Sequence, residues 1–278
     1  MEIVSKSNEK IKYINSLKEK KYREKYSRYV LEGIKVIDEH LSLEEPNAPE
    51  LIVLSKELLF KAQGGIELYE KIKHLKNVLE VSNSVFEYLS DTETPQGILL
   101  VLEKRENNLQ DLNYKLLKEE KVIVLDKVSD SGNMGTIIRT AVAFGIKNVI
   151  CTKGCVDVYS SKVIRSSMGA IEKVNIFNFD NGEMYKFSEL LKEHGYILCG
   201  TDLKATKYLN ETKPNNKIVY VLGNEANGMS EGVKILCNDL VKIPMENIQE
   251  SLNVAIAAAI LMYNGYVGGE IGGSKITD

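Results

Sequence analysis

The second half of the chain alternates short apolar runs with helical segments, and this pattern constrains the fold more than any other feature. The runs are apolar on both faces, as strands buried in a parallel sheet are. They lie at Val122–Leu125, Asn148–Thr152, Lys173–Asn178, Tyr196–Gly200, Ile218–Leu222 and Leu240–Ile243. Helical segments separate most of them, at Gly135–Phe144, Ser160–Met168, Met184–His194 and Ser251–Tyr263. The sequence therefore predicts an α/β fold with a parallel sheet.

The first half shows a second, smaller alternation. We expect helices at Glu9–Lys25, Gly33–Leu41, Leu58–Lys73 and Asn83–Leu89, and strands at Glu50–Leu54, Asn77–Val81 and Gly97–Glu103. This order predicts a small α/β sandwich. A length of 278 residues also favours two domains. We expect an N-terminal domain at residues 1–105, a linker at 106–118, a second domain at 119–265 and a flexible tail at 266–278.

Composition excludes several classes of protein. No apolar run approaches the roughly 18 residues that a membrane span needs, and the N-terminus is too charged for a secretory signal. We therefore expect a cytoplasmic protein. The four cysteines lie in mostly apolar stretches without histidine neighbours, so free thiols are expected and no metal is implied.

Positive charge gathers near the N-terminus although the formal net charge is −3. Between Lys6 and Lys35, lysine and arginine outnumber the acidic residues more than twofold, and tyrosines are interleaved among them. Phosphate contact and base stacking use this mixture. We predict RNA contacts here; the alternative is a solvated helix face with tyrosines packed beneath it. The predicted RNA-binding residues are Lys18, Lys20, Lys21, Arg23 and Arg28.

Three polar segments in the second half hold most of the residues that look placed for chemistry. They are Asn133–Arg139, Leu222–Glu225 and Ile243–Val254, and none of the three histidines of the chain lies in them. Group transfer from an activated donor suits such a site better than hydrolysis, which usually needs a base to activate water. Neither a G-x-G fingerprint nor a P-loop is present, so a nucleotide would have to be bound in another way.

These segments resemble three ordered motifs of a known family. LDKVSDSGNMGTIIRTAVAFG at Leu125–Gly145, VLGNEANGMS at Val221–Ser230 and IPMENIQESLNVAIAAAI at Ile243–Ile260 are similar to those of the SpoU/TrmH branch of SPOUT RNA methyltransferases. The resemblance covers residues 119–264. Upstream, Arg28–Leu41 and Leu89–Glu103 look like the RNA-binding domain that many of these enzymes carry, which is similar to a ribosomal-protein fold.

The resemblance implies a deep trefoil knot in the second domain, an exception to the rule against threaded chains. It implies a homodimer formed through that domain. It also implies that S-adenosyl-L-methionine (SAM) lies bent among three loops, its adenine read mainly by backbone groups. The implied cofactor-binding residues are Thr201, Leu222, Gly223, Ile243, Met245 and Leu252.

The implied reaction is methyl transfer to a ribose 2′-hydroxyl of RNA, with rRNA favoured over tRNA. We expect Arg139 to clamp a phosphate and stabilise the developing alkoxide, because a guanidinium is a poor base. The residues expected to orient it and the ribose are Asn133, Glu225, Ser251 and Asn253. Several of these residues have a plainer reading: Asn133 and Ser251 could cap helices, Glu225 could be a turn carboxylate and Arg139 an ordinary surface charge. Gly223 could simply end a strand.

Two other functions stay open from the sequence. A noncatalytic RNA-binding protein could keep the knot without turnover, and an α/β enzyme of metabolism could use a small substrate. The polar residues of all three motifs speak against the first alternative. The basic, tyrosine-rich N-terminal segment speaks against the second.

Overall fold

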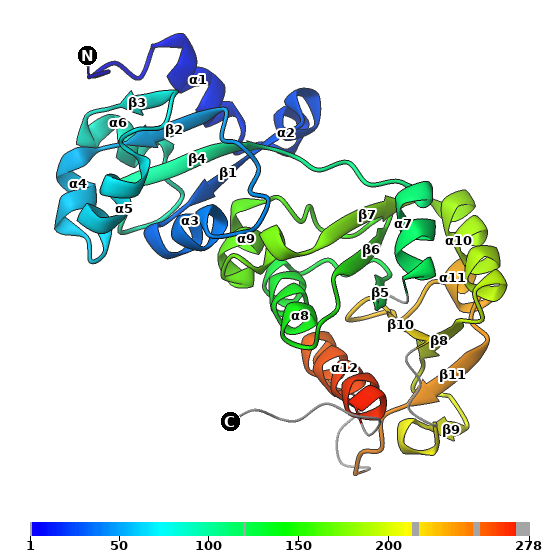
Figure 1. Ribbon diagram of the computed structural model, residues 1–278. Helices are drawn as coiled ribbons and strands as arrows, with labels where there is room; N and C mark the ends of the chain where they lie inside the picture. Colours follow the sequence, from blue (N-terminus) through cyan, green and yellow to red (C-terminus); the bar gives the residue numbers. More distant parts are fainter. Residues whose placement is uncertain (1, 119–120, 213–216, 247–250, 271–278) are drawn as a thin grey trace. The chain divides into compact units, whose positions relative to one another are not determined.

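The computed structural model describes residues 2–118, 121–212, 217–246 and 251–270. The chain divides into two compact units. Unit 1 comprises Met1–Lys104 together with Tyr159–Glu172, and unit 2 comprises Arg105–Val158 and Lys173–Asp278. The chain therefore passes between the units three times (Figure 1). The predicted boundaries at residues 105 and 118 do not anticipate the short segment from the second half that belongs to unit 1.

Unit 1 is built on a four-stranded mixed sheet in the order β1-β4-β2-β3. Strand β4 pairs antiparallel with both β1 and β2, while β2 and β3 run parallel. The strands are β1 (Arg28–Glu32), β2 (Leu51–Leu54), β3 (Val78–Glu80) and β4 (Ile98–Glu103). The helices are α1 (Glu9–Ser16), α2 (Lys20–Tyr26), α3 (Ile34–Leu41), α4 (Lys56–Lys61), α5 (Gly65–Ile72), α6 (Asn83–Leu89) and α9 (Ser161–Ser167), followed by the short helix η1 (Ala170–Lys173).

Apolar packing explains the layers of unit 1. Ile11 and Ile14 of α1 and Phe86 of α6 are buried in one cluster with Val53 and Leu99 of the sheet. Helix α3 packs against β1 and β4. The central strand β4 is buried from Ile98 to Leu102, which requires cover on both faces. This is the small α/β sandwich that the alternation of elements predicts.

Two long helices predicted in this region are each broken in two. The helix expected at Glu9–Lys25 divides into α1 and α2, and the guanidinium of Arg23 donates to the carbonyls of Leu17 and Lys18 at the break. These carbonyls would otherwise lack a partner at a helix end. The helix expected at Leu58–Lys73 divides at Gly64, whose φ of 80° is left-handed. Strand β1 was not predicted.

A buried polar cluster ties the segment Tyr159–Glu172 to the rest of unit 1. The carboxylate of Glu172 accepts a hydrogen bond from the Tyr29 hydroxyl at 2.5 Å and lies 2.9 Å from Nδ1 of His40. Nε2 of His40 lies 3.0 Å from the carbonyl of Asn47, so this nitrogen carries a proton. The side chains of Glu172 and His40 are 4% and 0% exposed. The buried polar groups of this cluster therefore have hydrogen-bond partners only while all its members are present.

Unit 2 is a seven-stranded sheet in the order β7-β6-β5-β10-β8-β11-β9, with every recorded strand pair parallel. Its strands are β5 (Val122–Leu125), β6 (Asn148–Thr152), β7 (Asn175–Phe179), β8 (Ile197–Thr201), β9 (Lys207–Tyr208), β10 (Ile218–Leu222) and β11 (Asp239–Lys242). Its helices are α7 (Leu109–Leu117), α8 (Ser131–Ala143), α10 (Asn181–Glu193), α11 (Glu231–Lys234) and α12 (Val254–Glu270), with the short helix η2 (Leu209–Glu211). The parallel α/β prediction is confirmed.

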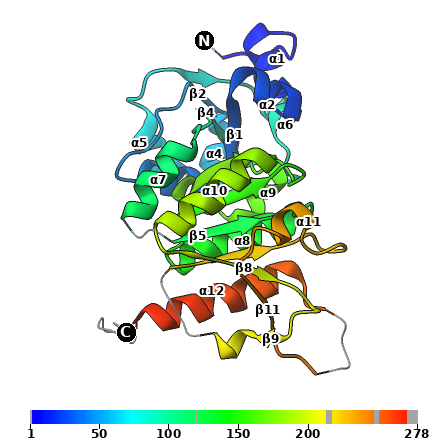
Figure 2. The same ribbon diagram turned by 90° about the vertical axis from the view of Figure 1, so that its right-hand side faces the viewer.

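Helices cover both faces of this sheet (Figure 2). Helices α7, α10 and α11 share a buried cluster with the strands, to which Leu116, Phe187 and Val233 contribute. Helix α12 packs on α8 and β10. Within the described part of the chain, no helix is long and apolar enough to cross a membrane.

Several boundaries in unit 2 differ from prediction because of capping. Helix α8 starts at Ser131, since Asp130 caps it by accepting from the backbone N–H of Asn133. Asn133 is thus in the first turn and is not the cap. Helix α12 starts at Val254, where Asn253 accepts from the N–H groups of Ala255 and Ile256; Ser251 is not the cap.

The remaining differences concern short elements. Helix α7 lies inside the predicted linker at residues 106–118, and α12 continues to Glu270, into the predicted tail. Residues 271–278 of that tail lie outside the described part. Strand β9 and helix α11 were not predicted, and both are shorter than the span over which periodicity can be read.

The buried cluster around Glu172 generates a stability prediction. Glu172→Ala should lower the free energy of unfolding by about 3 kcal/mol, because it leaves two buried polar groups without their hydrogen-bond partner. Urea titration followed by circular dichroism measures this. The control is Glu189→Ala, whose partner Lys192 is 56% exposed, and it should cost less than about 0.5 kcal/mol. An equal loss of unfolding free energy in the two variants would contradict the role given to Glu172.

Candidate functional site

The carboxyl ends of four neighbouring strands of unit 2 meet at one edge of the sheet. Strands β5, β10, β8 and β11 are adjacent and parallel, and they end at Leu125, Leu222, Thr201 and Lys242. Ligands of such sheets bind at this edge. All three polar segments singled out in the sequence either follow these strand ends or begin the helix after them.

A cleft of about 500 Å³ opens at this edge. Its volume is within the range of sites for small ligands and cofactors. All six predicted cofactor-binding residues line it: Thr201, Leu222, Gly223, Ile243, Met245 and Leu252. Ser251 and Glu225 line it as well. The Thr201 hydroxyl donates to the carbonyl of Val221 at 3.1 Å, which fixes this side chain against β10.

Position 223 must be a glycine, because backbone atoms of the following loop approach it too closely for a side chain. A Cβ at this position would lie 2.2 Å from the carbonyl carbon of Gly228 and 2.2 Å from the nitrogen of Met229. The loop between these residues closes on itself, because Asn224 and Gly228 exchange backbone hydrogen bonds at 2.9 and 3.0 Å. The plain reading, that Gly223 simply ends a strand, misses this close approach. Any side chain here would displace one wall of the cleft.

Hydrogen bonds centred on Glu225 join the three polar segments. Its carboxylate accepts from the backbone N–H groups of Ser129 and Asp130 at 3.3 and 3.2 Å and from Nδ2 of Asn133 at 3.1 Å. Oδ1 of Asn133 in turn accepts from Nδ2 of Asn253 at 2.9 Å. Glu225, Asn133 and Asn253, which are far apart in sequence, therefore form one continuous chain of hydrogen bonds.

The electrostatics of Glu225 follow from these contacts. Burial raises the pKa of its carboxyl, but hydrogen bonds from backbone N–H groups and from Asn133 lower it more. The net pKa lies below the usual value, so Glu225 is ionised at neutral pH. The carboxylate can only accept hydrogen bonds in this state.

Two residues that organise the site were given no individual role from the sequence. Asp126 is 1% exposed and accepts from the Thr152 hydroxyl at 2.7 Å and from the N–H of Ser230 at 2.6 Å. Nδ2 of Asn224 donates to the carbonyl of Lys127 at 2.9 Å. Both fix the Gly223–Ser230 loop against the end of β5. Asp126 and Asn224 each stand within two residues of a strand end, a signal that could have identified them.

Arg139 stands apart from this network. It is exposed on α8 and does not line the cleft. Among the residues that the structure describes, no hydrogen bond or ion pair holds its guanidinium. The expectation that Asn133, Glu225, Ser251 and Asn253 orient Arg139 directly is therefore not matched by a contact, although Arg139 is available to an incoming phosphate.

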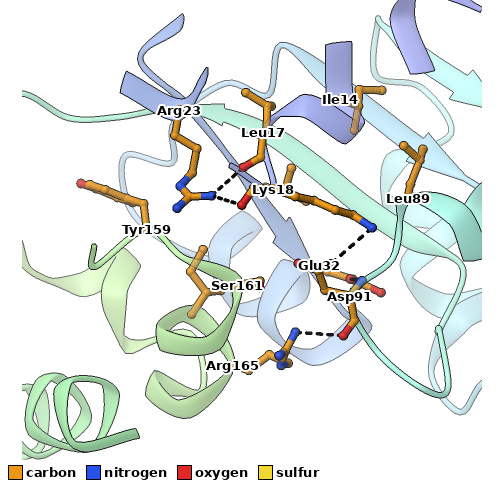
Figure 3. A pocket seen from close by; sticks show the side chains of 12 residues that line it. Ile14, Leu17, Lys18, Arg23, Glu32, Leu89, Asp91, Tyr159, Ser161 and Arg165 are labelled. Atoms are coloured by element: carbon orange, nitrogen blue, oxygen red, sulfur yellow. Dashed lines mark hydrogen bonds and ion pairs between the residues drawn. The ribbon is translucent and has the colours of Figure 1, made fainter. Parts of the chain in front are cut away.

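The predicted RNA-binding residues of unit 1 differ in their surroundings. Arg23 is 5% exposed and donates to two backbone carbonyls at 2.7 Å, which argues against the predicted RNA contact. Lys18 donates to the carbonyls of Tyr88 and Ser90 and pairs with Asp91 at 3.2 Å. Figure 3 shows both side chains at a small cavity of unit 1, of about 30 Å³. That volume suits about one water molecule.

The other three residues differ in their exposure. Arg28 pairs with Glu50 at 2.6 Å and with Glu103 at 3.2 Å. Lys20 and Lys21 are 60% and 67% exposed, and their partners, Glu24 and Glu19, are exposed as well. Of the five predicted residues, only these two lysines combine a mostly exposed side chain with an exposed, weak ion pair. In the part of the chain that the structure describes, no group of three or more His, Cys, Asp or Glu side chains could hold a metal.

Comparison with known proteins agrees with this geometry. Residues 120–263, just over half of the chain, match the family model described as the SpoU rRNA Methylase family, and residues 8–100 match the MRM3-like substrate binding domain. The 23S rRNA (guanosine(2553)-2'-O)-methyltransferase RlmP of Bacillus subtilis is 29% identical over 95% of this chain and 98% of its own length. A putative TrmH family tRNA/rRNA methyltransferase of Staphylococcus aureus (strain COL) is 32% identical, over 73% of this chain and 83% of its own.

Solved structures agree over nearly the whole chain. An AdoMet-bound rRNA methyltransferase from Sinorhizobium meliloti has a TM-score of 0.81 at 26% identity, covering 95% of this chain and 97% of that one. The resemblance read from the three motifs is thereby confirmed. With these motifs assembled at one sheet edge and a matching domain before them, the chain belongs to the SpoU rRNA methylase family.

Proposed function

We propose that this protein transfers a methyl group from SAM to a ribose 2′-hydroxyl of ribosomal RNA. The observation that carries the proposal is the convergence of Glu225, Asn133 and Asn253 beside a cleft of cofactor size. The Bacillus subtilis relative, which aligns over nearly the whole chain, is by its name an rRNA 2′-O-methyltransferase. A tRNA substrate is the less favoured alternative.

The cleft fits SAM in volume and in chemistry. Leu222, Ile243, Met245 and Leu252 supply an apolar wall for an aromatic base, and the absence of a side chain at Gly223 keeps backbone groups accessible. When bound, SAM supplies a methyl group made electrophilic by its positively charged sulfur. The protein has to bind the two reactants, align them and handle the charge that develops.

Arg139 is the residue we assign to the RNA. A guanidinium stays protonated in proteins, so it can donate to a phosphate and to a developing alkoxide but cannot take a proton. Its exposed position on α8 leaves it available to RNA. The Glu225–Asn133–Asn253 chain of hydrogen bonds fixes the start of α8, on which Arg139 lies, relative to the cleft.

The architecture expected from the family completes the proposal. Strand β10 lies between β5 and β8 although the chain reaches it last of the three, an order that supports a knotted domain. Ile256 and Tyr263 of α12 are 53% and 58% exposed, and a second copy could cover them. The homodimer stays a prediction, which sedimentation velocity on the full chain tests. A cytoplasmic location likewise stays a prediction.

Gly223→Ala should abolish detectable SAM binding, because the new Cβ must push the loop that forms one wall of the cleft. Isothermal titration calorimetry on the full chain measures this. Gly232→Ala is the matched control: a Cβ there meets nothing within 4 Å. The control should bind SAM with unchanged affinity. Normal binding by the Gly223 variant would place the cofactor elsewhere.

Arg139→Ala should lower kcat for rRNA methylation at least about a hundredfold, as loss of a transition-state donor does. SAM affinity should stay within about twofold, because Arg139 does not line the cleft. Arg139→Lys should also be poor, since a point charge does not replace a planar fork. Lys186→Ala, an exposed change on α10, serves as control. Turnover near normal in Arg139→Ala would refute this role.

Lys20→Gln combined with Lys21→Gln should weaken RNA binding and flatten its salt dependence. Each lost phosphate contact removes roughly 0.7 to 0.9 from the slope of log K against log salt. Filter binding at several salt concentrations measures the slope. Lys192→Gln in unit 2 is the control and should leave the slope unchanged. An unchanged slope in the double variant would favour the reading of α2 as a solvated face.

A further inference from the structure

The cleft is lined by charged as well as apolar residues. Apolar lining residues lie at the end of β10, after β11 and before α12: Leu222, Ile243, Met245 and Leu252. The loop after β8 and helix α11 contribute four charged lining residues: Asp202, Lys204, Glu231 and Lys234. A ligand that is aromatic at one end and zwitterionic at the other matches this combination.

Among these charged lining residues, Asp202 and Lys234 form an ion pair. Their side chains are 15% and 32% exposed, so the pair is partly shielded from water. Asp202 is held firmly: its N–H donates to the carbonyl of Val241 at 3.0 Å, and its Oδ1 accepts from the N–H of Lys204 at 2.8 Å. The hydrogen bond from Lys234 holds the pKa of the Asp202 carboxyl below its usual value and raises the pKa of Lys234. Both groups are charged at neutral pH.

A purely structural role explains little about this pair. Helix α11 is already held by Val233, which is 3% exposed in the core, and by the bond from the N–H of Ser230 to Asp126. An ion pair near the surface adds little stability. Both residues of the pair line the cleft. A role in stability alone would not require that position.

We propose that Asp202 and Lys234 bind the amino acid end of SAM, with Asp202 facing the α-ammonium and Lys234 facing the α-carboxylate. The inference rests on the proposed function, since it assumes that the cleft holds SAM. When the zwitterion lies alongside the ion pair in this orientation, each of its charges faces a charge of opposite sign. The apolar wall then takes the adenine end, and the two ends together fix the direction in which the cofactor lies.

Two ligands that differ mainly in this end make the test specific. S-Adenosylhomocysteine carries the amino acid group, and 5′-methylthioadenosine lacks it while keeping the adenosine and the thioether. In the full chain, Asp202→Asn and Lys234→Met should each weaken S-adenosylhomocysteine about tenfold or more, as loss of a hydrogen bond to a charged group does. Affinity for 5′-methylthioadenosine should change less than about twofold in calorimetry.

A charge reversal separates binding from structure. Asp202→Lys together with Lys234→Asp keeps an ion pair but reverses its order, so it preserves a structural link while opposing the zwitterion. This variant should keep the unfolding midpoint of the wild type and still bind S-adenosylhomocysteine weakly. Lys192→Met, which breaks the exposed pair with Glu189, is the control and should bind both ligands normally.

The outcomes distinguish this inference from the proposed function. If the wild type binds neither ligand, the cofactor site itself is wrong. If the wild type binds both ligands, and the variants either weaken them equally or weaken neither, the assignment of Asp202 and Lys234 is overturned and the cofactor site stands. Recovery of S-adenosylhomocysteine binding by the charge reversal would likewise overturn it in favour of a structural link.

Discussion

The carboxylate of Glu225 holds together segments that the chain itself keeps far apart. It accepts from two backbone N–H groups ahead of α8 and from Asn133, which in turn bonds to Asn253 ahead of α12. Charge-assisted bonds of this kind are about twice as strong as neutral ones. Because the loop carrying Glu225 also forms a wall of the cleft, its position fixes both the cofactor site and the start of the helix that bears Arg139.

Much of the sheet was predictable and many helix ends were not. Strands β5, β6 and β10 match their predicted bounds, since runs such as Val122–Leu125 are apolar on both faces and bounded by polar residues. Helix starts depend on one side-chain bond, and several candidates stood near each start. Asp130 and Asn253 make those bonds, while Asn133 and Ser251 do not.

In the candidate site, too, some features were predictable from the sequence and others were not. The residues predicted to line the cleft do so, because parallel topology brings strand ends to one edge. The roles of the basic residues between Lys6 and Lys35 were harder to predict. Composition cannot show that Arg23 is buried against two carbonyls, or that Lys18 is committed to Tyr88 and Ser90. Both cations stabilise the fold where the sequence suggested an RNA surface.

The segment Tyr159–Glu172 has a consequence for how such chains can be recombined. It is encoded within the second half but completes the packing of the first, through Glu172 and its bonds to Tyr29 and His40. The two halves are therefore not independent cassettes. An exchange of residues 1–104 between relatives transfers Tyr29 and His40 without the carboxylate that they bind, so a functional chimera has to carry both segments from the same parent.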